Sequence, residues 1–210
     1  MSISDYAERN ARQQGSESDP FTESRYAQFA KFLPAGPLKV LDVGCNTGRG
    51  GAALKRLRPD LQLFGLDLLQ QRLDRLPRDV YSGTVCGSAT RIPTEDETYD
   101  AIVAGEFIEH LLPMDAHRFL ADAFRVLKVR GQLLLTTPNP GDVKMRARGG
   151  TCLGGAHLSQ HHPDTLKTVL KMYGFARVHV RGSGKVSWYL GDRFPWLGLY
   201  GSFLATGEKV

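Results

Sequence analysis

Cysteine is scarce in this sequence, and its spacing excludes several classes of protein. The 210 residues include only three cysteines, Cys45, Cys86 and Cys152, and no two of them have the C-x-x-C spacing of a metal or redox motif. An odd and widely spaced set of cysteines argues against a disulfide framework and indicates reduced thiols. We therefore expect a cytoplasmic protein.

Long apolar runs are also missing. No stretch reaches the roughly 18 apolar residues of a membrane-spanning helix, so we expect no transmembrane segment. The first residues, MSISD, lack the basic and apolar regions of a signal peptide. A hydrophobic content of 41% over this length is typical of one globular domain with a sizeable core.

The glycine-rich segment after the apolar run 38–43 lacks both common nucleotide-binding signatures. Counted from Gly44, the next two glycine positions of G-x-G-x-x-G hold Asn46 and Arg49, and no G-K-[ST] follows. The order of strand, tight turn and helix remains, with Asp42 two residues before Gly44. A carboxylate there would repel a pyrophosphate and suits a cationic ligand.

This segment resembles motif I, D-x-G-x-G-x-G, of the class I S-adenosylmethionine-dependent methyltransferases, whose cofactor carries an ammonium and a sulfonium group. The resemblance covers roughly residues 25–207 and implies cofactor contacts from Asp42, Gly44, Asn46 and Gly48. Asn46 replaces the middle glycine, and asparagine tolerates positive φ better than most residues. The alternative is a glycine-rich turn that binds no ligand.

Two later segments extend the resemblance. The expected strand 61–67 ends in Asp67, about 20 residues past the first turn, where a βαβ site binds ribose hydroxyls. Asp67 and the adjacent Leu68 are therefore candidate cofactor residues, although Asp67 also suits the cap of the next helix. After an expected strand 80–86 the chain reads GSATRIP where the family usually has G-D-A-x-x-L-P, which implies Ser88 and Ala89 near the adenine.

The alternation of apolar and helical segments predicts the fold. Further strands are expected at 99–105, after a turn at Gly131, at 175–180 and at 199–205, with a helix at 166–173. Strands that alternate with amphipathic helices indicate an α/β protein, and the resemblance implies a Rossmann-like, doubly wound, seven-stranded, mostly parallel sheet with helices on both faces.

The same reading divides the chain into segments. Residues 21–210 are expected to form the methyltransferase domain, with a cap loop near 141–162. Residues 1–20 are polar and are expected to be either disordered or a lid over the cofactor.

The box Glu106-x-x-Glu109-His110 follows the fourth expected strand. If a helix starts there, the three side chains share one face, and Glu106 lies at the edge of the cofactor. Two carboxylates and an imidazole suit Mg²⁺ or Mn²⁺, and zinc less well. His157 is a candidate fourth ligand.

The box resembles the E-x-x-E-H motif of ubiquinone-biosynthesis O-methyltransferases and of small-RNA 3′-end 2′-O-methyltransferases, which implies a metal that binds neighbouring hydroxyls of the acceptor. Elsewhere in the family, E-H-L occurs where no metal is expected. Without a metal, His110, His157 or His161 is the candidate general base, because methyl transfer to a hydroxyl needs alignment and proton removal.

Charge and aromatic residues give further indications about the acceptor. The formal net charge is +5, and Lys144, Arg146 and Arg148 cluster in the expected cap loop. Such a cluster suits a phosphate or carboxylate on the acceptor, or is a solvated loop. Segment 188–200 holds both tryptophans and two tyrosines, which suit core packing, a homodimer contact, or stacking on sugars and lipids.

The sequence therefore predicts an S-adenosylmethionine-dependent methyltransferase that methylates oxygen on a small or medium acceptor, such as a sugar, glycolipid or quinone-type metabolite. Two alternatives stay open. One is an RNA ribose 2′-O-methyltransferase, which the absence of room for a separate RNA-binding domain disfavours. The other is a non-catalytic module that only binds the cofactor.

Overall fold

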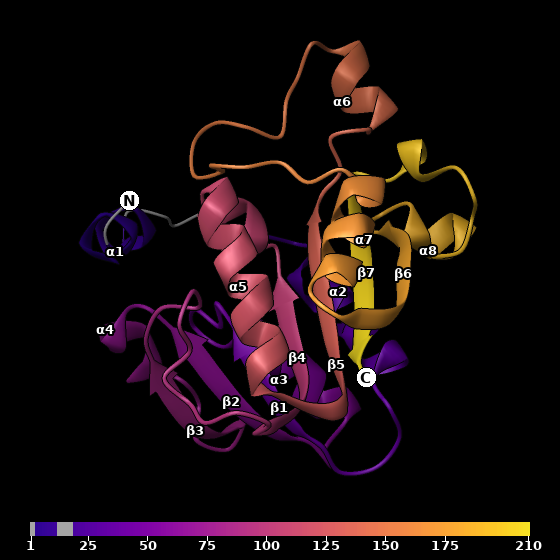
Figure 1. The fold of residues 1–210 in the computed structure, drawn as a ribbon. Coiled ribbons are helices and arrows are strands. Elements are labelled where there is room, and N and C mark those ends of the chain that lie inside the picture. Colours follow the sequence, from indigo (N-terminus) through magenta and orange to yellow (C-terminus); the bar gives the residue numbers. More distant parts are fainter. Residues whose placement is uncertain (1–2, 12–18) are drawn as a thin grey trace.

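Seven strands form one sheet in the computed structural model, which describes residues 3–11 and 19–210 (Figure 1). The strands are β1 (Lys39–Val43), β2 (Gln62–Asp67), β3 (Tyr81–Cys86), β4 (Tyr99–Gly105), β5 (Leu127–Pro138), β6 (Phe175–Ser183) and β7 (Ser202–Lys209). Their order is β3-β2-β1-β4-β5-β7-β6, and only β7 runs antiparallel to its neighbours. The predicted seven-stranded, mostly parallel sheet is confirmed.

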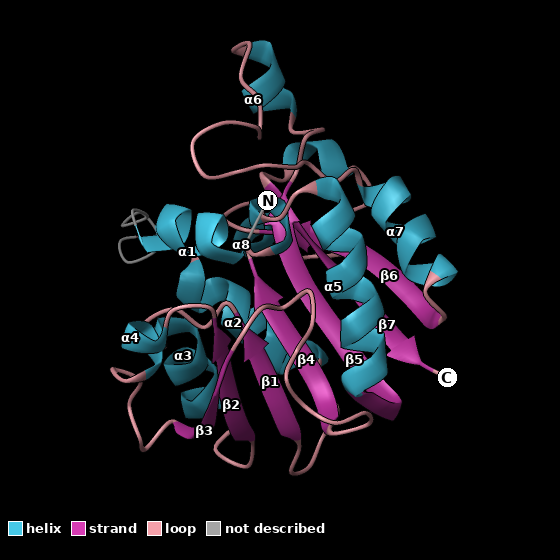
Figure 2. Ribbon diagram, turned by 60° about the vertical axis from the view of Figure 1, so that its left-hand side comes forward, coloured by secondary structure: helices cyan, strands magenta, loops and turns pink. Residues whose placement is uncertain are grey.

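Helices cover both faces of this sheet (Figure 2). One face packs against α5 (Pro113–Val126) and α7 (Pro163–Met172), and the other against α2 (Thr22–Phe32), α3 (Arg49–Leu57) and α4 (Gln70–Leu73). The central strands are apolar almost throughout, as strands buried on both faces must be.

Helix α5 shows how the sequence specifies this layer. Pro113 occupies its first turn, where the missing amide is not needed. Its apolar residues recur three or four positions apart and face the sheet, namely Ala116, Phe119, Leu120, Ala123 and Val126. The proline therefore favours the observed start of the helix, and the apolar spacing determines which of its faces packs on the sheet.

Two strand boundaries differ from the prediction. Strand β5 starts at Leu127, directly after α5, and not after a turn at Gly131. The expected turn is a kink inside the strand, because Arg130 has φ +65° and a Cβ at Gly131 would lie 2.7 Å from the carbonyl oxygen of Lys128. Strand β7 starts at Ser202, because 197–199 form a short 3-10 helix.

Three short helices lie at the edge where the parallel strands end: α1 (Ile3–Ala11), α6 (Val143–Ala147) and α8 (Ser187–Leu190) (Figures 1 and 2). Helix α6 belongs to the expected cap loop and extends beyond the rest of the molecule. The expectation for residues 1–20 falls partly on 1–2 and 12–18, outside the described residues. Among the described residues, no helix is long and apolar enough to span a membrane.

Candidate active site

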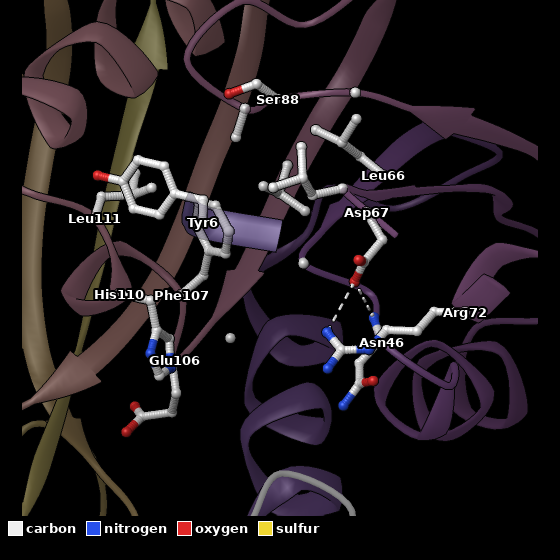
Figure 3. Close-up of a pocket in the computed structure, with 16 residues that line it drawn as sticks. Tyr6, Asn46, Leu66, Asp67, Arg72, Ser88, Glu106, Phe107, His110 and Leu111 are labelled. Atoms are coloured by element: carbon white, nitrogen blue, oxygen red, sulfur yellow. Dashed lines mark hydrogen bonds and ion pairs between the residues drawn. The ribbon is translucent and has the colours of Figure 1, made fainter. Parts of the chain in front are cut away.

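A pocket opens where β1, β2 and β4 end, and it gathers most of the predicted cofactor residues (Figure 3). Seven of the nine predicted residues line it: Gly44, Asn46, Asp67, Leu68, Ser88, Ala89 and Glu106. The chain brings them together from four separate connections, since the carboxyl ends of parallel strands meet at one edge of the sheet. Other lining residues were not assigned from the sequence, namely Val43, Leu66, Arg72, Gly87, Gly105, Phe107 and Leu111. Tyr6 also lines the pocket, and it belongs to residues 1–20, which were expected to be either disordered or a lid.

The turn after β1 adopts the conformation that its glycine and asparagine allow. Gly44 has φ +70°, and a Cβ there would lie 2.6 Å from the Phe107 ring. Asn46 has φ +48°, which confirms that asparagine replaces the middle glycine without loss of the turn. The amide nitrogens of Gly44 and Cys45 both donate to the carbonyl oxygen of Leu66, so the turn is anchored on β2.

Asp67 is held rigidly at the pocket wall, where Figure 3 shows its contacts. One carboxylate oxygen accepts from the amide of Asn46 at 3.1 Å, and the other accepts from the amide of Leu69 at 2.9 Å. The guanidinium of Arg72 lies 3.7 Å away. The acid therefore links the turn after β1 to the end of β2, and it also stabilises the segment that leads into α4.

Asp42 and Gly48 are the two predicted cofactor residues that do not line the pocket. Asp42 is fully buried beneath the turn and accepts hydrogen bonds of 2.6 Å from both Tyr26 and Tyr81. Burial raises the pKa of its carboxyl group to about 6. The expectation of a direct contact between Asp42 and a cationic ligand is thus corrected, because the side chain supports the turn from below. Gly48 precedes α3 at φ +85°.

The expected helix does not start at Glu106. This residue has φ +50°, and only a 3-10 turn, Ile108–His110, follows. The side chain of Glu106 turns toward α2 and β7, where it lies 3.4 Å from Arg25 and accepts from Ser202. Glu106, Glu109 and His110 therefore do not share one helical face, which corrects the predicted ligand set.

Glu109 and His110 instead meet His157 from the cap loop. One potential ligand atom from each of the three residues lies within 4.8 Å of the others. The Nδ1 atoms of His110 and His157 lie 3.2 and 2.9 Å from backbone carbonyl oxygens. Thr137 donates to one carboxylate oxygen of Glu109, and the other oxygen is buried with no hydrogen-bond partner among the described residues.

The protonation of this cluster is set mainly by burial. Burial raises the pKa of Glu106, and burial together with the nearby Glu106 charge raises the pKa of Glu109. Burial, and next the neighbouring His157, lower the pKa of His110 to about 4. The imidazole of His110 is therefore neutral at pH 7, as a proton acceptor or metal ligand must be.

His161, the third predicted base, lies apart from this cluster. Its Nε2 is 2.9 Å from the hydroxyl of Ser159, and both line a separate cavity between α5 and α7. Lys144, Arg146 and Arg148 are exposed on α6 and just after it, and none of them lines the cofactor pocket.

Part of the sequence is similar to known methyltransferases. Residues 41–135 match a family model described as "Methyltransferase domain". A demethylmenaquinone methyltransferase of Thermotoga maritima is 32% identical over 114 residues, which are 54% of this chain and 49% of that protein. The mitochondrial ubiquinone biosynthesis O-methyltransferase of Bos taurus is 27% identical over 161 residues, which are 68% of this chain and 42% of that protein.

A solved structure extends the likeness to most of the chain. The crystal structure of a SAM-dependent methyltransferase from Thermotoga maritima covers 90% of both chains, with a TM-score of 0.69 and 20% identity, and so shares the fold. The chain spans about half or less of the length of the curated relatives it matches. Residues 41–135 are thus similar to a methyltransferase domain, and the chain has the fold of a solved SAM-dependent methyltransferase.

Proposed function

We propose that this protein transfers the methyl group of S-adenosylmethionine to a hydroxyl group of a small, quinone-type acceptor. One observation carries the proposal. His110 lines the cofactor pocket and also belongs to the cluster of Glu109 and His157. A site for the methyl donor is thus contiguous with buried groups that can accept a proton or bind a cation.

The reaction needs alignment and one proton acceptor. The acceptor oxygen attacks the methyl carbon in line, the bond from carbon to sulfur breaks, and its electron pair stays on the sulfur. The hydroxyl proton must leave as the new bond forms. His110 is neutral at pH 7 because burial lowers its pKa, and either it or His157 is placed to take that proton.

The cluster also fits a divalent cation, which we include in the proposal. An imidazole whose Nδ1 donates to a carbonyl presents the lone pair of Nε2, and metal-binding histidines are commonly oriented in this way. The unpartnered oxygen of Glu109 supplies an anionic donor to the same space. A bound Mg²⁺ or Mn²⁺ would hold two neighbouring hydroxyls of the acceptor and lower their pKa.

The names of the relatives favour a quinone-type acceptor. Two of them are a demethylmenaquinone methyltransferase and a ubiquinone biosynthesis O-methyltransferase. A catechol-type quinol offers adjacent hydroxyls, which suit the cluster. Sugar and glycolipid acceptors remain predictions from the sequence, as does an anionic group on the acceptor.

The test uses S-adenosylmethionine with a labelled methyl group and a catechol-type quinol. We expect transfer of the label, loss of transfer with EDTA, and recovery with Mg²⁺ or Mn²⁺. His157→Ala should reduce kcat roughly 100-fold or more, the usual range for a general base. His179→Ala, which alters an exposed histidine on β6, is the matched control.

The outcomes separate the alternatives. Methyl transfer that EDTA leaves unchanged would exclude the divalent cation and leave a histidine as the general base. Cofactor binding without transfer to any acceptor would favour the non-catalytic module, and transfer to RNA with a steep loss of binding in salt would favour the ribose methyltransferase.

A further inference from the structure

One end of the molecule carries an unusual concentration of exposed aromatic side chains. They belong to α8 and to the segment that joins it to β7. We call this set, together with five nearby exposed cations, the aromatic-basic rim. The cations are Lys144, Arg146, Arg148, Lys185 and Arg193. Its apolar members and their exposed fractions are Trp188 (56%), Tyr189 (76%), Leu190 (45%), Phe194 (39%) and Trp196 (59%). Large side chains of this kind are normally buried, so their grouping calls for a partner surface.

The rim is continuous with α6. Gly198 lies between the two segments, because a Cβ there would be 3.1 Å from Nε1 of Trp196 and 3.3 Å from Cγ1 of Val143. The side-chain amide of Asn139, just after β5, also donates to the carbonyl oxygens of Leu197 and Tyr200. The segment that follows α8 therefore lies against α6, which extends from the top of the molecule in Figure 1.

The rim also borders the candidate active site. The ring of Trp188 packs against Phe21, with ring centroids 6.1 Å apart. Phe21 precedes the first turn of α2, which carries Arg25, and Arg25 lies beside Glu106 at the pocket. Whatever covers the rim is thus close to the entrance of the site.

The net charge of the rim is positive. Its exposed cations are Lys144, Arg146, Arg148, Lys185 and Arg193. Among residues 3–11 and 19–210, none of them forms an ion pair with a carboxylate. The two acids of these segments are already engaged, since Asp142 caps α6 and Asp192 is buried against Lys31. The face therefore complements a negatively charged surface.

We propose that the aromatic-basic rim binds the surface of an anionic lipid bilayer and holds the active site against it. Tryptophan and tyrosine accumulate at the boundary between headgroups and acyl chains. Each lysine or arginine near an anionic leaflet adds further attraction. The binding goes beyond the proposed methyl transfer and does not depend on it, but it would deliver a lipid-soluble acceptor to the site directly from the membrane.

The sequence provides an intrinsic probe for this proposal. The chain has two tryptophans, Trp188 and Trp196, and both belong to the rim. The full chain is mixed with vesicles of phosphatidylcholine alone or with one third phosphatidylglycerol. With the anionic vesicles we expect tryptophan emission to shift to shorter wavelength and brominated lipid to quench it, and added salt to weaken both effects.

Variants test which side chains bind the vesicles, and vesicle sedimentation measures the binding. The triple variant K144S/R146S/R148S should bind anionic vesicles roughly tenfold to a hundredfold more weakly. The double variant W188S/W196S should also bind more weakly. The matched controls, Lys171→Ser and Met172→Ser, alter exposed residues at the end of α7 and should bind like the parent.

Two results would overturn the proposal. One is absence of sedimentation and of any spectral shift with the anionic vesicles, while the protein still binds S-adenosylhomocysteine. The other is concentration-dependent self-association that W188S/W196S abolishes, without vesicle binding, since that would assign the rim to a second copy of the chain. Loss of methyl transfer with vesicle binding intact would contradict only the proposed function.

Discussion

At the scale of one residue, Asp42 is an acid whose charge the fold disfavours. Burial raises the pKa of its carboxyl group from 3.8 to about 6, although the hydroxyls of Tyr26 and Tyr81 favour the charged form. Between these two values the folded state binds more protons than the unfolded state. The free energy of unfolding therefore falls as the pH rises through this window, and Asp42 stabilises the fold fully only below pH 3.8.

We expect Asp42→Asn to remove this dependence. The free energy of unfolding of the variant minus that of the parent should rise by about 3 kcal/mol from acidic to neutral pH, because about two pKa units are involved. Urea titrations at several pH values measure the difference. His110, with its pKa lowered to about 4, has the opposite slope in both proteins and cancels. A difference that does not vary with pH would contradict the raised pKa.

Asp67 is the residue with the clearest consequence for cofactor binding. Asp67→Ala removes the candidate acceptor for ribose hydroxyls and leaves the amides of Asn46 and Leu69 without their partner. We expect the Kd for S-adenosylhomocysteine to rise roughly 5- to 150-fold, which corresponds to about 1–3 kcal/mol. Calorimetry measures it, with the exposed Asp74→Ala as control. An unchanged Kd would remove Asp67 from the site.

Site residues that follow directly after a strand could be predicted from the sequence. Side-chain positions that depend on an unusual backbone dihedral angle or on distant partners could not. Gly44, Asn46 and Asp67 follow directly from apolar runs that end in a turn. Glu106 was misplaced because its φ of +50° breaks the helix that the E-x-x-E-H spacing invites. Nothing local in the sequence shows that Asp42 points beneath the turn, since its two tyrosine partners lie 16 and 39 residues away.

At the scale of elements, α1 closes one side of the cofactor pocket. The hydroxyl of Tyr6 donates to Asp115 at 2.7 Å and accepts from the amide of Leu112 at 2.8 Å, so one side chain ties α1 to the start of α5. Arg9 also donates to the carbonyl oxygen of Gly155 in the cap loop. These contacts support the predicted lid, which remains a prediction.

We expect Tyr6→Phe to loosen this lid. The variant leaves the Leu112 amide and one oxygen of Asp115 without a partner, a loss of about 1–3 kcal/mol in the closed form. S-adenosylhomocysteine should therefore dissociate faster, as measured by stopped-flow displacement, while Tyr189→Phe, which alters an exposed ring, should match the parent. An unchanged dissociation rate would show that α1 does not retain the cofactor.

The boundaries of the strands show the same contrast: those that follow an apolar run were predicted well, and one that depends on a local backbone kink was not. The ends of β1, β2 and β4 follow the apolar runs closely, because strands buried on both faces tolerate few polar residues. The start of β5 was misjudged, because the kink at Arg130 and Gly131 interrupts a strand that already pairs at Leu127. Glycine marks both a turn and a bulge, so the sequence alone does not separate them.

At the scale of the whole molecule, ligand binding and stability are linked. S-adenosylhomocysteine that binds the folded chain alone, at about 100 times its Kd, should stabilise it by about 2.7 kcal/mol. For a domain of this size that corresponds to a rise in Tm of about 5–11 °C.

Hydrogen exchange should slow at α1, at the turn after β1 and at the ends of β2 and β4, but not in β6 and β7, which lie at the far side of the sheet. Asp67→Ala should reduce the Tm shift at the same ligand concentration, and His179→Ala should retain it. Protection centred on β6 and β7, or no shift at all, would place the ligand elsewhere or exclude it, because only binding at the carboxyl ends of β1, β2 and β4 predicts this pattern.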